Sequence, residues 1–314
     1  MAYEQDICGK EFTLKSIPVL ILIFMTVFSV SCRNKQDQKP LSAGGGPVNE
    51  TRIVAGKPIP ELNISYHLMT EGIKHLDSQY SPEQIHILLG LNRIDKKALR
   101  RVDTLIVPDT FIANWLAYAP FPAHLQALDS ISKILLFSYR LQAFAAYENG
   151  KLIRWGPTSL GKKSTPTHTG LFHCNWKAKR TISTIDDEWI LDWYFNLENK
   201  SGVSMHQYEL PGYPASHACA RLAEHDAKWI YHWAAQWKLS DNGQQILAYG
   251  TPVIIFGSYD FSKKLHRNIL NGKEAVHLTE DELGEVIRLH LSLILERQRT
   301  RKMLDTASSD QGIR

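Results

Sequence analysis

The chain of 314 residues is long enough for about two domains, and its composition, 44% hydrophobic and 22% charged, is that of a globular protein. A net charge of +4 without a concentrated basic patch gives no indication of nucleic-acid binding. The four cysteines are too few for a scaffold held together by disulfides; they are Cys8, Cys32, Cys174 and Cys219.

An apolar run over residues 17–30 precedes a polar stretch near the N-terminus. Its length of about 14 residues is typical of a signal-peptide core and short for a transmembrane helix, which needs about 20. The run ends in Phe28-Ser29-Val30-Ser31-Cys32, which resembles a bacterial lipobox. We therefore expect residues 1–31 to be a lipoprotein signal peptide and Cys32 to be lipidated. A plain cleaved signal and an uncleaved anchor are the alternatives, and all three place the rest of the chain outside the cytoplasm.

The segment 32–60 is rich in proline, glycine, serine and lysine, with three consecutive glycines at positions 44–46. Such a composition is typical of a flexible linker. We predict a tether that lets an anchored domain reach away from a lipid surface.

Residues 61–128 have a helical pattern. Ser81, Pro82 and Gln84 form a capping-box signal, followed by apolar residues at helical spacing. Residues 82–108 resemble the second half of a LysM module, in which a helix and an asparagine-containing turn lead to a short strand that ends in proline. Its first strand is not recognisable. We predict a small helical, LysM-like accessory region; a helical region without affinity for glycan is the alternative.

From residue 131 the pattern changes to strands. Two β-prone runs, 131–138 and 141–147, are followed by Asn149-Gly150, the strongest short signal for a hairpin turn. Further strands are expected over 189–195 and 251–256. One helix is expected over 223–237, so the middle of the chain is predicted to be mainly β.

The tail, residues 258–314, is predicted to end in one helix. Residues 279–282 form a second capping box. An apolar stripe follows and is expected to pack on the protein's own core; it consists of Leu283, Val286, Ile287, Leu291 and Ile294.

Residues 216–221 read Ser-His-Ala-Cys-Ala-Arg, and His206 lies upstream. A thiol needs a nearby base to become a nucleophile, and histidine is the usual one. An arginine offers a planar fork for a carboxylate. The pattern predicts acyl transfer on an acidic peptide. A zinc site from His206, His217, Cys219 and His225 is the alternative, but the spacing fits no familiar zinc pattern.

Several ordered segments agree with the same interpretation. They are Glu148–Leu152, Gly161-Lys162, Thr165–Phe172, Ser204–His206, Pro214–Leu222, Asp226-Ala227 and Gly250–Ile255. Together they resemble an L,D-transpeptidase catalytic domain of the YkuD type, over about residues 131–257. The resemblance implies a YkuD-like β-sandwich at 129–257, no cofactor and no metal.

The resemblance also implies an activity. Such enzymes use a cysteine to attack the third residue of a peptidoglycan stem tetrapeptide and release D-alanine. A diaminopimelate amine of a second stem peptide then resolves the acyl-enzyme into a 3→3 cross-link. Water or a protein lysine as acceptor would instead give an L,D-carboxypeptidase or a lipoprotein-attaching enzyme. The expected location is the periplasmic side of the cell envelope, with a lipid anchor in the membrane.

Matching these segments to the motifs of the family implies a role for each site residue. Cys219 would be the nucleophile, His206 the proton donor and acceptor, and His217 an orienting or polarising group. Arg221 would hold a substrate carboxylate. The backbone amides around Ala218 and Cys219 would form the oxyanion site, and Ser216 would form hydrogen bonds within the same turn.

Two residues depart from the family pattern. Ala218 and Gln207 stand where glycines are usual. If position 218 needs a positive φ, alanine there costs of the order of 1 kcal/mol or more. A non-catalytic peptidoglycan-binding lipoprotein is therefore a further alternative.

Overall fold

The computed structural model describes residues 64–183, 189–200, 202–262 and 277–311. All of them belong to one compact unit, residues 56–314. The predicted signal peptide, the lipidated Cys32 and the tether lie outside the described residues. Within the described part, no helix combines the length and the apolar character needed to cross a membrane.

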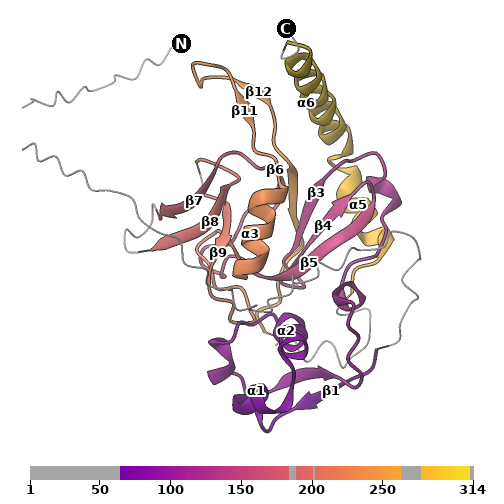
Figure 1. The fold of residues 1–314 in the computed structure, drawn as a ribbon, viewed down its shortest axis with the longest axis vertical. Helices are drawn as coiled ribbons and strands as arrows, with labels where there is room; N and C mark the ends of the chain where they lie inside the picture. Colours follow the sequence, from indigo (N-terminus) through magenta and orange to yellow (C-terminus); the bar gives the residue numbers. More distant parts are fainter. Residues whose placement is uncertain (1–63, 184–188, 201, 263–276, 312–314) are drawn as a thin grey trace, which may run out of the picture. The chain divides into compact units, whose positions relative to one another are not determined.

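A nine-stranded sheet forms the centre of this unit (Figure 1), which confirms a mainly β fold. The sheet is continuous and curls. Two strand pairs are parallel, β13 with β3 and β10 with β9, and the other pairs are antiparallel. In spatial order the strands are β6 (Gly170–His173), β13 (Pro252–Phe256), β3 (Ile134–Ser138), β4 (Ala143–Glu148), β5 (Lys151–Ser159), β10 (Ala220–Leu222), β9 (Ser204–Gln207), β8 (Ile190–Asn196) and β7 (Lys177–Ile182).

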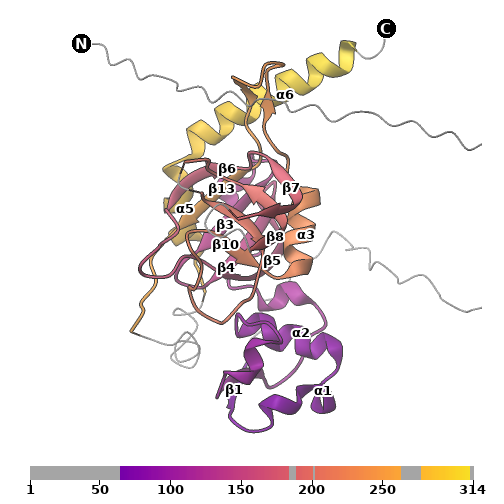
Figure 2. The same ribbon diagram turned by 90° about the vertical axis from the view of Figure 1, so that its left-hand side faces the viewer.

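The central strands are buried on both faces. In β3 all five residues are buried, with Leu135 and Phe137 in one hydrophobic cluster and Ile134 and Leu136 in another. A strand covered on both sides reads as a continuous apolar run rather than an alternating one. Helix α3 (Glu224–Trp233) packs against β8 and β9 within the first of these clusters (Figure 2).

The turn between β4 and β5 confirms the predicted hairpin. Asn149 and Gly150 have φ angles of 46° and 75°, as a type I′ turn requires at its two central residues. Another hairpin joins two short strands, β11 (Lys238–Leu239) and β12 (Ile246–Ala248).

The N-terminal region has two antiparallel strands around two helices. They are β1 (Tyr66–Met69), α1 (Leu76–Gln79), α2 (Pro82–Leu91) and β2 (Leu105–Pro108), joined by 3₁₀ turns. The predicted capping box is confirmed, since the Gln84 amide donates to Ser81 Oγ over 3.3 Å and the Ser81 amide donates to Gln84 Oε1 over 2.9 Å. The sequence did not reveal β1, which is four residues long and partly exposed.

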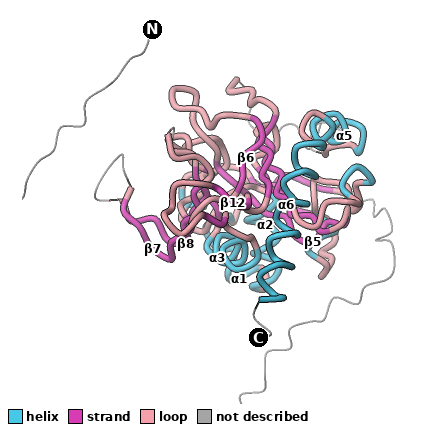
Figure 3. Tube along the Cα trace, turned by 90° about the horizontal axis from the view of Figure 1, so that it is seen from above, coloured by secondary structure: helices cyan, strands magenta, loops and turns pink. Residues whose placement is uncertain are grey.

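The C-terminal tail forms two helices where one was predicted. Helix α5 (Glu280–Arg288) has Leu289 as its C-cap, and α6 (Leu291–Gln311) follows it (Figure 3). The predicted cap at Thr279 is confirmed, and the stripe packs on the core, with Leu283 and Ile287 fully buried. The exposed Leu289 lies at the break between the helices.

The N-terminal region is tied to the loop between β9 and β10. Asp95 Oδ2 accepts a hydrogen bond from the Leu210 amide over 2.9 Å, and the Asp95 amide donates to the Leu210 carbonyl over 3.0 Å. Ile94 forms a β-bridge with Pro211. Asp95 Oδ1 also accepts from the Ala98 amide over 2.9 Å, so one carboxylate fixes two backbone segments.

We predict that Asp95→Ala lowers the free energy of unfolding by about 1–3 kcal/mol, because two backbone donors lose their carboxylate acceptor. Urea unfolding would measure the change. Asp77→Ala is the matched control: Asp77 pairs with Lys96 at the surface, with 80% of the Asp77 side chain exposed, and its loss should change little. Equal stability of the two variants would contradict the prediction.

Candidate active site

Strands β9 and β10 bring the predicted catalytic side chains together. In their parallel pairing Ala220 lies opposite Met205 and Arg221 opposite His206. Alternate residues of a strand share a face, so Cys219, just before β10, lies on the Arg221 side. A cavity of about 30 Å³ is lined by Ser183, Trp189, Leu191, His206, Tyr208, Ser216, His217, Cys219 and Arg221. It has room for about one water molecule.

The thiol of Cys219 is a free, largely buried group. Ser204 Oγ donates a hydrogen bond to Cys219 Sγ over 3.0 Å, and the sulfur lies 3.5 Å from the Gly202 carbonyl oxygen, toward which it donates. Burial raises the pKa of the Cys219 thiol, and hydrogen bonds from Ser204 and the charge of Arg221 partly offset that rise. The resting group is therefore a protonated thiol.

The imidazole of His206 is 95% buried and neutral. Its Nδ1 lies 3.0 Å from the Gln207 carbonyl oxygen, which can only accept, so Nδ1 carries the proton and Nε2 keeps its lone pair. Burial, with a smaller contribution from Arg221, lowers the pKa of His206 to about 4. The site thus holds a neutral thiol and a neutral base.

His217 is oriented by a residue to which the sequence gave no role. Its Nε2 lies 2.7 Å from Lys162 Nζ. An ammonium only donates, so His217 Nε2 accepts and Nδ1 carries the proton. Burial and the charges of Lys162 and Arg221 lower the pKa of His217. This tautomer leaves His217 unable to act as a base through Nε2, which agrees with an orienting role.

Arg221 presents a guanidinium without a carboxylate partner among the described residues. Its central carbon lies 4.5 Å from the centroid of the Tyr208 ring. Burial lowers its pKa, and the group stays charged at neutral pH. A positioned, unpaired guanidinium beside a thiol is suited to hold an anionic group of a ligand.

Comparison with known proteins matches this part of the chain. The model of the YkuD family, an L,D-transpeptidase catalytic domain, matches residues 132–255. This part of the chain is therefore similar to an L,D-transpeptidase catalytic domain of the YkuD family. A curated relative, L,D-transpeptidase 1 of Mycobacterium tuberculosis, is 25% identical over 146 residues, which cover 38% of this chain and 58% of the relative.

Solved structures give more distant likenesses. A crystal structure of Mycobacterium tuberculosis L,D-transpeptidase 1 has 23% identity and a TM-score of 0.31 over 40% of this chain and 62% of that one. An L,D-transpeptidase from Stackebrandtia nassauensis has 22% identity and a TM-score of 0.33 over 41% of this chain and 57% of that one. The chain thus spans about three fifths of the length of these proteins.

The turn that carries the Cys219 thiol is strained at Ala218. Its φ of 72° lies in the left-handed region, which confirms that alanine stands where glycine is favoured. The Ala218 amide donates to the Thr165 carbonyl over 3.2 Å, so it is not available to an oxyanion, contrary to expectation. The Cys219 amide makes no hydrogen bond with the other described residues, and it is the amide of this turn left for that role.

Hydrogen bonds from neighbouring residues hold the turn 216–219 in place. Ser216 Oγ donates to the Cys219 carbonyl, which agrees with a structural role for Ser216. The Lys162 amide donates to the Ser216 carbonyl over 3.0 Å, and Thr165 Oγ1 donates to it over 3.2 Å. Gly161 forms a β-bridge with Ser216. A side chain at position 161 would collide with the backbone of residues 165–167.

Of the aromatic residues in the segment 189–195, Trp189 lines the small cavity. Its ring lies 5.3 Å from that of His217 and 6.4 Å from that of Tyr208. Phe195 instead packs in the hydrophobic core, and Trp193 packs against Tyr231 of α3.

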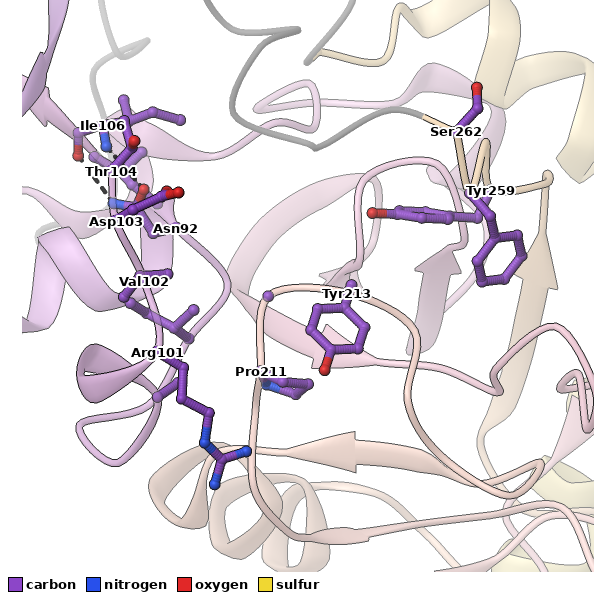
Figure 4. Close-up of a pocket in the computed structure, with 15 residues that line it drawn as sticks. Asn92, Arg101, Val102, Asp103, Thr104, Ile106, Pro211, Tyr213, Tyr259 and Ser262 are labelled. Atoms are coloured by element: carbon purple, nitrogen blue, oxygen red, sulfur yellow. Dashed lines mark hydrogen bonds between the residues drawn. The ribbon is translucent and has the colours of Figure 1, made fainter. Parts of the chain in front are cut away.

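Larger cavities lie elsewhere. One of about 430 Å³ has Arg101 and Asn92 on one side and Tyr213 and Tyr259 on the other (Figure 4). It is lined by no cysteine or histidine, whereas the smaller cavity is lined by Cys219, His206 and His217.

The alternative of a zinc site gains no geometric support. No group of three or more metal-binding side chains occurs among the residues that the structure describes. His225 lies on α3, where its ring packs 5.0 Å from that of His86 and its Nε2 lies 3.4 Å from Asp226 Oδ2.

We predict that Ala218→Gly raises the free energy of unfolding by about 1 kcal/mol, because glycine adopts a left-handed φ without steric cost. Urea unfolding would measure the gain. Ala220→Gly is the matched control, since Ala220 is buried in β10 and glycine in a strand should destabilise. A loss of stability in Ala218→Gly would contradict the strain at this position.

Proposed function

We propose that this protein is a peptidoglycan L,D-transpeptidase that forms 3→3 cross-links between stem peptides and releases D-alanine, with Cys219 as the nucleophile. The observation that carries the proposal is the convergence of Cys219, His206 and Arg221 from two paired strands on one cavity. The domain match supports the reaction type.

The first half-reaction consumes the donor tetrapeptide. His206 Nε2 takes the proton of the Cys219 thiol, and the thiolate attacks the carbonyl carbon of the third residue. The tetrahedral intermediate collapses as His206 returns the proton to the departing D-alanine amine. A thioester between Cys219 and the third residue remains.

The second half-reaction uses an amine of another stem peptide. The amine attacks the thioester carbonyl and its proton passes to His206. The cysteine thiolate leaves and recovers that proton, which restores the neutral pair. The peptide bond so formed joins the third residues of two stem peptides.

The remaining side chains orient the substrate. The Arg221 guanidinium holds the D-alanine carboxylate beside the thiol. The free Cys219 amide faces the developing oxyanion, where one such donor typically contributes about 3 kcal/mol of transition-state stabilisation. Lys162 keeps His217 in one tautomer and one orientation. Because the cavity accommodates about one water molecule, it must widen when the peptide binds.

The proposal includes a location. Cys32 carries a lipid anchor, and the segment 32–60 tethers the catalytic domain on the periplasmic side of the cell envelope. The lipobox-like run at residues 28–32 supports this part.

Purified disaccharide-tetrapeptide tests the function, with products read by mass spectrometry beside Cys219→Ala. We expect a cross-linked dimer lighter by one D-alanine, absent with Cys219→Ala because the nucleophile is gone. A tripeptide without dimer would overturn transpeptidation in favour of a carboxypeptidase. No turnover, with Cys219 also unreactive toward a carbapenem, would instead indicate a non-catalytic binding protein.

The pH dependence tests His206. Activity needs its neutral form, so activity is present above its pKa and is lost as the pH falls through that value. Since burial lowers this pKa to about 4, we predict that kcat/KM for D-alanine release falls only as the pH approaches about 4. Rates measured from pH 3.5 to 8 check this. A fall centred near the ordinary histidine value of about 6.5 would contradict it.

A further inference from the structure

Ser204 lies beside the nucleophile on the neighbouring strand. Ala220 and Met205 are opposite each other in the parallel pairing of β10 and β9, so the preceding residues, Cys219 and Ser204, are also neighbours. Ser204 is fully buried. Its side chain and that of His206 alternate with Met205, so both lie on the same face of β9.

The Ser204 hydroxyl is committed to the sulfur. It donates to Cys219 Sγ over 3.0 Å, and it makes no other hydrogen bond within the described part of the chain. Toward the Gly202 carbonyl oxygen, 3.5 Å away, the Cys219 thiol is instead the hydrogen-bond donor.

Loss of the thiol proton changes these two contacts in opposite ways. The contact with the Gly202 carbonyl loses its hydrogen, and a carbonyl oxygen does not stabilise an anion. The hydroxyl of Ser204 still donates, and its bond becomes stronger because the acceptor is now charged. Of the two hydrogen-bonded neighbours of the sulfur, Ser204 therefore favours the thiolate and Gly202 the thiol.

A thiolate at Cys219 would need a hydrogen-bond donor to stabilise its charge. Cys219 is largely buried, and burial disfavours a thiolate. The imidazole of His206 is neutral before proton transfer, so it does not stabilise the anion in advance. Lys162 donates to His217 rather than to the sulfur.

We propose that Ser204 is a further catalytic residue, whose hydroxyl stabilises the Cys219 thiolate by a hydrogen bond to the reacting sulfur. The proposal rests on the proposed role of Cys219 as the nucleophile. A purely structural role is the competing explanation, in which a buried hydroxyl is satisfied by the nearest acceptor and has no effect on thiol reactivity.

The rate of alkylation of Cys219 by iodoacetamide, followed from pH 6 to 10, separates the two explanations. Peptide mass spectrometry of the full chain reports Cys219 apart from the other three cysteines. In Ser204→Ala we expect the midpoint of the profile to move to higher pH and the rate at pH 7 to fall about tenfold, the typical effect of one hydrogen bond to a charged group.

Ser138→Ala is the matched control. Ser138 is also a fully buried serine on a strand, but its hydroxyl accepts from the Leu141 amide over 3.3 Å. The alkylation profile of Cys219 in Ser138→Ala should coincide with that in the wild type. Ser204→Thr keeps the hydroxyl and should keep the profile near that of the wild type.

The alkylation profiles decide whether Ser204 stabilises the Cys219 thiolate. A profile of folded Ser204→Ala that coincides with the wild type overturns the proposal, and so does a Ser204→Thr profile that shifts as far as that of Ser204→Ala. Failure of the proposed function is seen separately. A wild type that neither cross-links nor trims disaccharide-tetrapeptide would disprove the reaction, whereas the alkylation profiles would still report the effect of Ser204 on the thiol.

Discussion

The parallel pairing of β9 with β10 is the constraint on which the site depends. It places His206 opposite Arg221 and Ser204 beside Cys219. A shift by one residue would turn one set of side chains to the other face of the sheet. Contacts outside the two strands support this pairing. The loop between β9 and β10 is hydrogen-bonded to Asp95 in the N-terminal region and to the segment 161–167. Regions distant in sequence thus fix the geometry of a small cavity.

Burial sets the chemistry of that cavity. It disfavours both charged forms, so the pKa of Cys219 rises and that of His206 falls. The resting site is therefore a neutral pair, not a thiolate–imidazolium pair. Groups that face the sulfur then decide how readily the proton moves, which gives the hydroxyl of Ser204 and the charge of Arg221 their importance.

The turn that carries Cys219 is strained at one residue and held in place by its neighbours. Ala218 has a left-handed φ, and the residues around it are held by hydrogen bonds from Lys162, Thr165 and Ser216. Such a conformation persists when the surrounding contacts over-determine it. The same contacts occupy the Ala218 amide, so the proposed mechanism uses the amide of Cys219 for the oxyanion.

The sequence by itself determined the features that depend on near neighbours. The capping boxes at Ser81 and Thr279 and the turn at Asn149-Gly150 were predictable because their partners lie within a few residues. The ordered motifs also predicted Cys219, His206 and Arg221 as site residues, and these three line one cavity. The tertiary structure alone decided the contacts of Lys162 with His217 and of Ser204 with Cys219, together with the loss of the Ala218 amide as a donor. These contacts join residues 15 to 55 positions apart. They depend on strand register and turn geometry, which no local periodicity records.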